Sequence, residues 1–287
     1  MSDALLDVEN LRVSYPGQGF RARTTEVLHG VSLTIAEGET LGVVGESGSG
    51  KTTIGRAVLG LAKPSGGQIH FAGADITHLA AKPRRALARD IQVVFQDPYT
   101  SLNPSLTIGD ILSEPLVVQG VSQQDARARI RELLDQVGLP ADAHERLPRE
   151  FSGGQRQRVA IARALALKPK LIVCDEPVSA LDLTTQARVL DLFLDIQRRT
   201  GVAYLFISHD LAVVRHISHR VTVLYQGDIV ETGPARIVTS TPGHPYTRRL
   251  LLAAPVPDPL AQRQRRAEWR RLAGTDSRRW ATAFQDR

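Results

Sequence analysis

Apolar and polar residues nearly alternate in the first part of the chain. This period of two residues predicts half-buried β-strands over residues 5–15 and 27–35. Nearly continuous apolar runs, which are typical of strands buried on both faces, occur at 40–44, 171–174 and 202–207. Shorter strands are expected at 68–71, 91–95, 221–225 and 229–231.

Helical spacing of apolar residues appears between and after these strands. It predicts helices over 52–61, 107–118, 122–137, 153–167 and 184–199. The predicted strands lie before Gln96 and from residue 171 onward, with helices between them, whereas the stretch from Gln96 to residue 170 is mainly helical. The pattern therefore predicts an α/β domain with an inserted helical block. Its mostly parallel sheet should be covered on both faces.

Composition and charge add limits to this picture. The chain has 287 residues, of which 42% are apolar, so it suits one large domain or one domain with an appendage. The formal net charge is +6, but residues 255–287 carry +4 of it, with eight arginines and four acidic residues. Three prolines within residues 255–259 indicate a boundary before this arginine-rich tail. The basic balance therefore does not by itself indicate a nucleic-acid partner.

Cysteine content and hydropathy exclude other classes. Cys174 is the only cysteine, so no intramolecular disulfide framework is possible and a cysteine-ligated metal cluster is not expected. The N-terminus lacks the basic and apolar regions of a signal peptide. No apolar stretch approaches the roughly 20 residues that cross a bilayer. A role at a membrane would therefore require docking on a membrane-spanning partner.

A phosphate-binding pattern, GxxxxGK[ST], follows the strand at 40–44. Its residues are Gly45, Glu46, Ser47, Gly48, Ser49, Gly50, Lys51 and Thr52, and Thr53 follows directly. Glycines let backbone N–H groups approach phosphates, the helix N-terminus adds positive potential, and Lys51 adds a full charge. The strand–loop–helix context predicts binding of a nucleoside triphosphate.

Two adjacent carboxylates, Asp175 and Glu176, end the apolar strand at 171–174. Carboxylates next to a buried strand are unfavourable unless they meet a positive charge. With a phosphate loop upstream, Asp175 is expected to hold Mg²⁺ together with the Thr52 hydroxyl. Glu176 lies one residue beyond and could orient or deprotonate an attacking water. The simpler alternative is an acidic turn after a strand.

A second glycine-rich turn comprises Ser152, Gly153, Gly154 and Gln155. Ser152 suits a helix N-cap, and the glycines expose backbone N–H groups at a positive helix end. A plain helix cap is the alternative. Read with the residues up to Leu165, the stretch resembles the signature of ATP-binding cassette (ABC) ATPases, with Phe151 in place of the family's usual leucine. In that family the signature covers the γ-phosphate held by the loop of a second subunit.

The resemblance extends over nearly all of residues 5–254 and implies a fold and further site residues. It implies a P-loop (RecA-like) parallel-sheet core, an N-terminal antiparallel β subdomain and an inserted α-helical subdomain at about 98–165. The ABC ATPase domain would span residues 1–254, and residues 255–287 would be an extension. Tyr15 resembles the aromatic residue that stacks on adenine, and Gln96 the loop glutamine that senses Mg²⁺ and water and faces the membrane partner. Asp182 lies in a loop similar to the one that connects the two active sites, and His209 matches the histidine that contacts the γ-phosphate.

Two stretches, 96–104 and 243–247, are similar to those of the oligopeptide/dipeptide importer ATPases, a branch that includes nickel and glutathione importers. The resemblance implies ATP and Mg²⁺ as ligands and a second ABC ATPase subunit, related or identical, as partner. It also implies two transmembrane permease subunits and, indirectly, an extracytoplasmic solute-binding protein, with no nucleic acid. The chain would lie peripherally on the cytoplasmic face of the cell (inner) membrane. Some relatives carry an iron–sulfur cluster in the C-terminal extension, and we expect none here.

Two other functions remain as alternatives. A soluble ABC ATPase acting on nucleic acid or the ribosome would suit the arginine-rich tail. However, Lys51 and Ser152 lie 101 positions apart without a coiled-coil insertion, and there is one cassette rather than two. A regulatory subunit without turnover is less suited, because every catalytic position holds a competent residue. The tail itself is interpreted as a solvated extension or packing arm, with contact to anionic lipid headgroups as the alternative.

Overall fold

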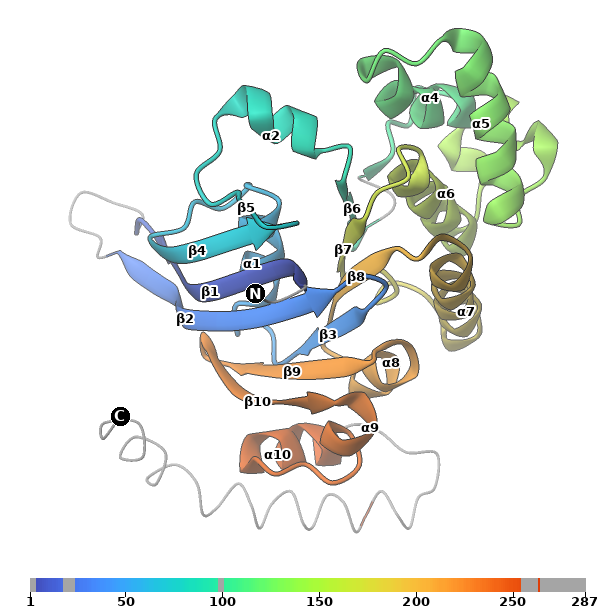
Figure 1. Ribbon diagram of the computed structural model, residues 1–287. Helices are drawn as coiled ribbons and strands as arrows, with labels where there is room; N and C mark the ends of the chain where they lie inside the picture. Colours follow the sequence, from blue (N-terminus) through green and yellow to red (C-terminus); the bar gives the residue numbers. More distant parts are fainter. Residues whose placement is uncertain (1–3, 18–23, 98–100, 254–262, 264–287) are drawn as a thin grey trace.

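The computed structural model describes residues 4–17, 24–97, 101–253 and 263 (Figure 1). Four strands form one sheet in the order β2-β1-β4-β5, and its neighbouring strands are antiparallel. They are β1 (Ala4–Tyr15), β2 (Thr25–Ala36), β4 (Gly66–Phe71) and β5 (Ala74–Asp75). This sheet is the predicted N-terminal antiparallel β subdomain.

Six further strands form a second sheet in the order β10-β9-β3-β8-β7-β6. All its pairs are parallel except β9 with β10. They are β3 (Thr40–Val44), β6 (Ile91–Val94), β7 (Leu171–Asp175), β8 (Ala203–Ser208), β9 (Arg220–Tyr225) and β10 (Asp228–Pro234). Because β3, β7 and β8 are parallel, their carboxyl ends lie at one edge of the sheet. The phosphate loop, the two carboxylates and His209 lie at these three ends.

Helices cover the sheet and form the separate block at the upper right of Figure 1. The block contains α4 (Ile108–Val118), α5 (Gln123–Gln136), the 3₁₀ turns η1 (Ala141–Glu145) and η2 (Pro148–Glu150), and α6 (Gly153–Leu165). The other helices are α1 (Lys51–Val58), α2 (Ala81–Leu87), α7 (Leu183–Thr200), α8 (Leu211–Ile217), α9 (Ala235–Val238) and α10 (Pro245–Ala253). Among the described residues, none of these helices is both long and apolar enough to cross a bilayer.

The central strands explain why their sequences are apolar without alternation. In β8, Tyr204 and Phe206 pack into the core shared with the helical block, while Leu205 and Ile207 pack into the core under the antiparallel sheet. β7 divides its side chains between the same two cores. Burial on both faces removes the polar positions that a half-exposed strand would show. The predicted α/β fold is confirmed.

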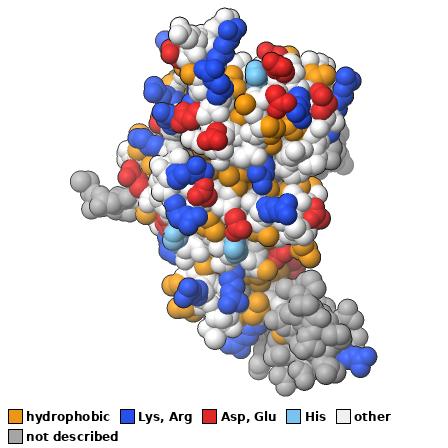
Figure 2. Space-filling model, turned by 90° about the vertical axis from the view of Figure 1, so that its right-hand side faces the viewer, with side chains coloured by type: hydrophobic (Ala, Val, Ile, Leu, Met, Phe, Trp, Pro, Cys, Tyr) orange, Lys and Arg blue, Asp and Glu red, His pale blue; other side chains and the backbone are white. Residues whose placement is uncertain are grey.

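The predicted elements and the observed ones differ in detail. Helices α2, α8, α9 and α10 were not predicted, because segments of four to nine residues are too short to show a clear helical period by themselves. Helix α1 is also short, with eight residues, but the phosphate-loop pattern before it indicated a helix there. On the face of the molecule shown in Figure 2, acidic and basic side chains are intermixed over most of the surface. The predictions for the arginine-rich tail concern residues that, apart from Arg263, lie outside the described part of the chain.

Candidate functional site

The phosphate loop runs from the end of β3 to the first residue of α1. Gly50, the N-cap of α1, has a φ of 106°, a left-handed conformation that favours glycine. Lys51 is only 4% exposed, and its Nζ donates to the carbonyl oxygens of Gly45 at 2.9 Å and Glu46 at 2.8 Å. Burial lowers the pKa of the Lys51 ammonium, although three nearby carboxylates oppose that shift. The loop thus holds a buried cation that a phosphate could meet.

A cavity of about 460 Å³ opens over this loop. It is lined by nine of the predicted site residues and by one residue that was not predicted, Val27. The nine predicted residues are Tyr15, Ser47, Gly48, Gly50, Lys51, Thr52, Thr53, Gln96 and Glu176. Tyr15 is 37% exposed at its edge, which leaves its ring accessible to a ligand. Val27 was not predicted as a site residue, because it is one of several apolar positions in β2. Five separate parts of the chain therefore meet at one cavity.

A carboxylate and a hydroxyl meet at the base of α1. Thr52 Oγ1 donates to Asp175 Oδ1 over 2.9 Å, which joins the first turn of α1 to the end of β7. Burial raises the pKa of Asp175, the Thr52 hydrogen bond opposes this, and neighbouring Glu176 adds to it. A carboxylate disfavoured by burial would gain from a nearby cation. Oxygen ligands of this kind suit Mg²⁺, so these two residues fit a magnesium site.

Glu176 and His209 form a hydrogen-bonded pair beyond the ends of β7 and β8. His209 Nδ1 lies 2.8 Å from Glu176 Oε2, and the Glu176 carboxylate is half-buried. Glu176 has a φ of 49°, a left-handed backbone uncommon outside glycine, and its N–H donates to the Ile207 carbonyl oxygen at 3.0 Å. Because β7 and β8 are adjacent parallel strands, their carboxyl ends place both side chains at the same edge. The geometry suits a general base held by an imidazole.

The second glycine-rich turn caps α6 as predicted. Ser152 Oγ accepts from the Gln155 N–H at 3.3 Å, and Gln155 Oε1 accepts from the Ser152 N–H at 2.9 Å. Gly154 packs against α7, where a Cβ at residue 154 would lie 2.3 Å from Thr185 Cγ2. Asp182 caps α7 by accepting from the N–H groups of Thr184 and Thr185. The turn and the Asp182 loop are therefore neighbours in one chain.

These capping residues stand apart from the phosphate loop. Ser152, Gly153, Gly154, Gln155 and Asp182 do not line the cavity that contains Lys51. The structure thus separates the predicted site residues into two groups. One group surrounds the phosphate loop, and the other forms a surface at the start of α6 and α7.

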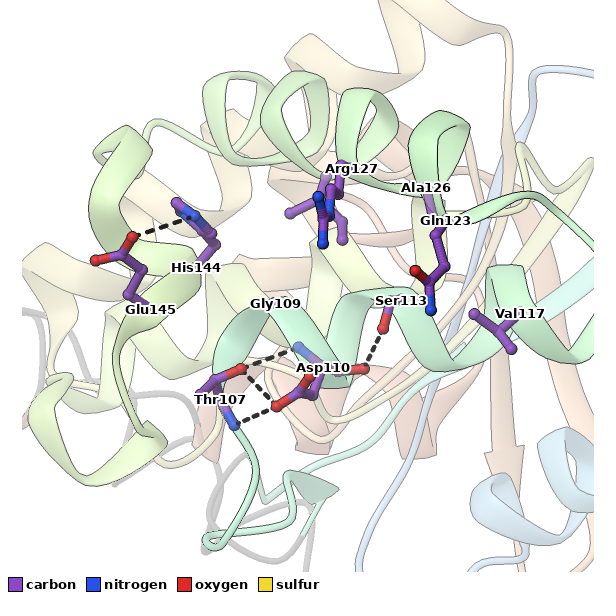
Figure 3. Close-up of a pocket in the computed structure, with 11 residues that line it drawn as sticks. Thr107, Gly109, Asp110, Ser113, Val117, Gln123, Ala126, Arg127, His144 and Glu145 are labelled. Atoms are coloured by element: carbon purple, nitrogen blue, oxygen red, sulfur yellow. Dashed lines mark hydrogen bonds and ion pairs between the residues drawn. The ribbon is translucent and has the colours of Figure 1, made fainter.

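A different cavity, of about 540 Å³, lies inside the helical block between α4, α5 and η1 (Figure 3). Its polar groups are largely engaged with one another, as in the capping box of Thr107 with Asp110 and the contact of His144 with Glu145. It contains none of the residues that the sequence assigned to the nucleotide. We therefore take the cavity over the phosphate loop as the candidate functional site.

Comparison with known proteins agrees with this architecture. A family model described as ABC transporter matches residues 28–179. The chain is 53% identical over 269 residues to the glutathione import ATP-binding protein GsiA of Escherichia coli (strain K12), covering 92% of this chain. It is 52% identical over 269 residues to the protein of the same name from Salmonella paratyphi A, again covering 92% of this chain. The match takes in 43% of each relative, so this chain spans less than half their length.

Solved structures show the same fold. The dimeric post-hydrolysis state of the ATP-binding cassette MJ0796, bound to ADP and Pi, matches with a TM-score of 0.72 and 31% identity. That match covers 80% of this chain and 99% of the other. CbiO1 from Clostridium perfringens, part of the ABC transporter complex cbiONQ, matches with a TM-score of 0.74 and 28% identity over 84% of this chain and 92% of the other. With the family model covering more than half of its residues, this chain belongs to the ABC transporter family.

Proposed function

We propose that this chain is the ATP-hydrolysing subunit of an importer for peptides or a related small solute such as glutathione. It would act with a second ABC ATPase subunit and two transmembrane permease subunits, supplied by an extracytoplasmic solute-binding protein. It would lie on the cytoplasmic face of the cell membrane. One observation carries the proposal. The cavity over the phosphate loop joins Lys51, Gln96 and Glu176, while the second glycine-rich turn of the same chain, residues 152–155, lies outside it. We call residues 152–155 the signature turn.

Phosphoryl transfer requires positioning and charge neutralisation more than covalent chemistry from the protein. The loop N–H groups and Lys51 would hold the β- and γ-phosphates, with Tyr15 against the base. A bound Mg²⁺ would neutralise phosphate charge, with Thr52 and Asp175 as its protein oxygens and Gln96 beside it. Glu176, oriented by His209, would take the proton of the water whose oxygen attacks the γ-phosphorus. The bond from that phosphorus to the bridging oxygen then breaks, and ADP leaves with the electron pair.

The signature turn would act on a different nucleotide. Ser152 and the exposed N–H groups of Gly153 and Gly154 form a positive helix end, which suits a phosphate. With Asp182 and its loop beside them, these residues would cover the γ-phosphate held by the partner subunit. Only the closed pair makes both sets of contacts, so ATP binding favours closure and hydrolysis releases it.

An apolar groove offers a route from this site to the permease subunits. The groove has a volume of about 550 Å³ and lies between the end of α1, α2 and β6. Leu61 is 64% exposed and Phe95 is 38% exposed along it, and Gln96 follows Phe95 directly. We expect a short amphipathic segment of a permease subunit to dock there. Movement of the Gln96 loop would then reach the membrane.

Replacing Lys51 with alanine should reduce MgATP affinity by on the order of 10- to 100-fold, because charge-assisted hydrogen bonds to phosphate would be lost. Both ATP hydrolysis and solute uptake should fall in vesicles that contain the chain with its permease subunits. Lys63→Ala, which removes an exposed lysine outside the cavity, is the control and should retain both activities. Uptake that continues with Lys51→Ala would contradict the proposal. ATP hydrolysis that responds to RNA or DNA but not to permease subunits would favour the soluble alternative instead.

Asp175→Asn should raise the Tm in the absence of nucleotide and lower it, relative to the wild type, in the presence of MgATP. Because burial raises the pKa of Asp175, the folded chain binds more protons than the unfolded chain between pH 3.8 and that raised pKa. The contribution of Asp175 to stability therefore falls as pH rises through this window. At neutral pH and without nucleotide, the variant should have a higher Tm than the wild type, since an amide keeps the acceptor for Thr52.

Adding MgATP should reverse that order, because the variant lacks the charged metal ligand. Thermal unfolding with and without MgATP measures both effects, and exposed Asp135→Asn is the control. A nucleotide-induced rise in Tm equal to that of the wild type would exclude Asp175 as a metal ligand.

A further inference from the structure

The phosphate loop is supported from behind by the C-terminal part of the chain. Gly45 packs so closely on β9 that a Cβ there would lie 2.1 Å from the Leu224 carbonyl oxygen. The Gly227 N–H, in the turn between β9 and β10, donates to the Ser49 carbonyl oxygen at 3.0 Å. These contacts fix the loop from residues about 180 positions further along the chain.

A third support comes from α10, which lies outside all the nucleotide-binding motifs. The Glu46 N–H donates to the hydroxyl oxygen of Tyr246 at 3.0 Å. The Tyr246 ring packs on that of Tyr225, with centroids 4.3 Å apart, and the residue is only 4% exposed. Burial raises the pKa of Tyr246 to about 12, so its hydroxyl stays neutral at physiological pH.

The hydrogen bond between Glu46 and Tyr246 involves the same peptide group that Lys51 contacts. The Glu46 N–H and the Gly45 carbonyl belong to one planar peptide group and point in opposite directions. Tyr246 contacts that group through its N–H, and Lys51 Nζ donates to its carbonyl oxygen at 2.9 Å. A rotation of this peptide group would break both contacts. The tyrosine hydroxyl and the phosphate-binding ammonium are therefore joined through a single rigid unit.

The start of α10 is itself firmly attached to the second sheet. The Glu231 carboxylate, on β10, accepts from the N–H groups of Gly243 at 2.7 Å and His244 at 3.1 Å. The Tyr246 N–H donates to His244 Nδ1 at 3.2 Å. These contacts bring Tyr246 to the loop with little freedom to move.

We propose that Tyr246 is a positioning residue for nucleotide binding. Its hydroxyl fixes the Gly45–Glu46 peptide group and so keeps Lys51 oriented before the triphosphate arrives. The inference rests on the proposed function and adds to it: the segment that follows the cassette motifs is part of what sets ATP affinity.

Tyr246→Phe removes only the hydroxyl and keeps the buried ring. It should raise the Kd for MgATP by roughly two- to tenfold, the scale of one net hydrogen bond, because ATP must now order the peptide group. The kcat at saturating ATP should stay at the wild-type value, since no group that touches the reacting atoms has changed. Titration with a fluorescent ATP analogue gives the Kd, and steady-state hydrolysis gives kcat.

Tyr225→Phe is the matched control, because it removes a hydroxyl from the ring packed against Tyr246 without removing the bond to Glu46. It should bind MgATP as the wild type does. A Tyr246→Phe chain whose Kd equals that of the wild type would overturn the inference, and so would a loss of Tm without nucleotide at unchanged Kd. If the wild type itself fails to bind MgATP, the proposed function falls and the inference falls with it.

Discussion

Replacing Glu176 with glutamine is expected to lower kcat for ATP hydrolysis by about 10²- to 10⁴-fold. The amide has the size of the carboxylate and can still contact His209, whose Nδ1 lies 2.8 Å from Glu176 Oε2 in the wild type. It cannot accept the proton of the attacking water. MgATP affinity should therefore stay within a few-fold of the wild type, and the ATP-bound closed pair should accumulate. Steady-state hydrolysis and nucleotide titration measure the two quantities separately.

Glu145→Gln provides the control for this prediction. Glu145 is an exposed carboxylate in η1 of the helical block, outside the cavity that contains Lys51. Its variant should hydrolyse ATP at the wild-type rate. Near-wild-type turnover by Glu176→Gln would remove Glu176 from the role of base.

Replacing Ser152 with aspartate should separate ATP binding from ATP-driven closure. Aspartate is as good an N-cap as serine, so α6 should remain folded. Its carboxylate would face the γ-phosphate held by the partner subunit, and such like-charge contact should weaken closure by on the order of 100-fold. The variant's own phosphate loop, which is unchanged, should bind MgATP with wild-type affinity.

The same substitution at the N-cap of α5, Ser122→Asp, is the matched control. Ser122 caps its helix by accepting from the N–H three residues later, as Ser152 does. Its hydroxyl also donates to the Asp125 carboxylate at 2.7 Å, so Ser122→Asp adds more like-charge repulsion within its own helix than Ser152→Asp does and is the stricter control for folding. Hydrolysis by the assembled transporter should fall with Ser152→Asp and persist with Ser122→Asp. Equal hydrolysis by both variants would show that the signature turn does not meet a nucleotide.

Much of the site could be predicted because its groups are carried by short contiguous motifs. The phosphate loop, the carboxylates after β7 and the Ser152 cap each depend on local geometry that neighbouring residues determine. The parallel order of β3, β8 and β7 then brings the phosphate loop and the carboxylates to one edge of the sheet, whereas the Ser152 cap lies apart from them at the start of α6. Local pattern and strand topology together account for the cavity over the phosphate loop.

What sequence reasoning missed depends on contacts between distant residues. The bond from Glu46 to Tyr246 joins positions 200 apart, and α10, which carries Tyr246, was too short to predict. The left-handed backbone of Glu176 could not be predicted from the sequence either. It occurs just after the end of β7, where the Glu176 N–H donates to the carbonyl oxygen of Ile207 on the neighbouring strand β8. In these cases tertiary contacts, rather than local propensity, determine the structure.

The most direct test of the account is a structure of the Glu176→Gln chain with MgATP, determined in the assembly with its partner ATPase subunit. We expect the triphosphate on Lys51 to be contacted by the signature turn of the other polypeptide. Ser152 of this chain should contact the nucleotide held by that partner. A triphosphate enclosed by one chain alone, with Ser152 facing solvent, would contradict the shared site.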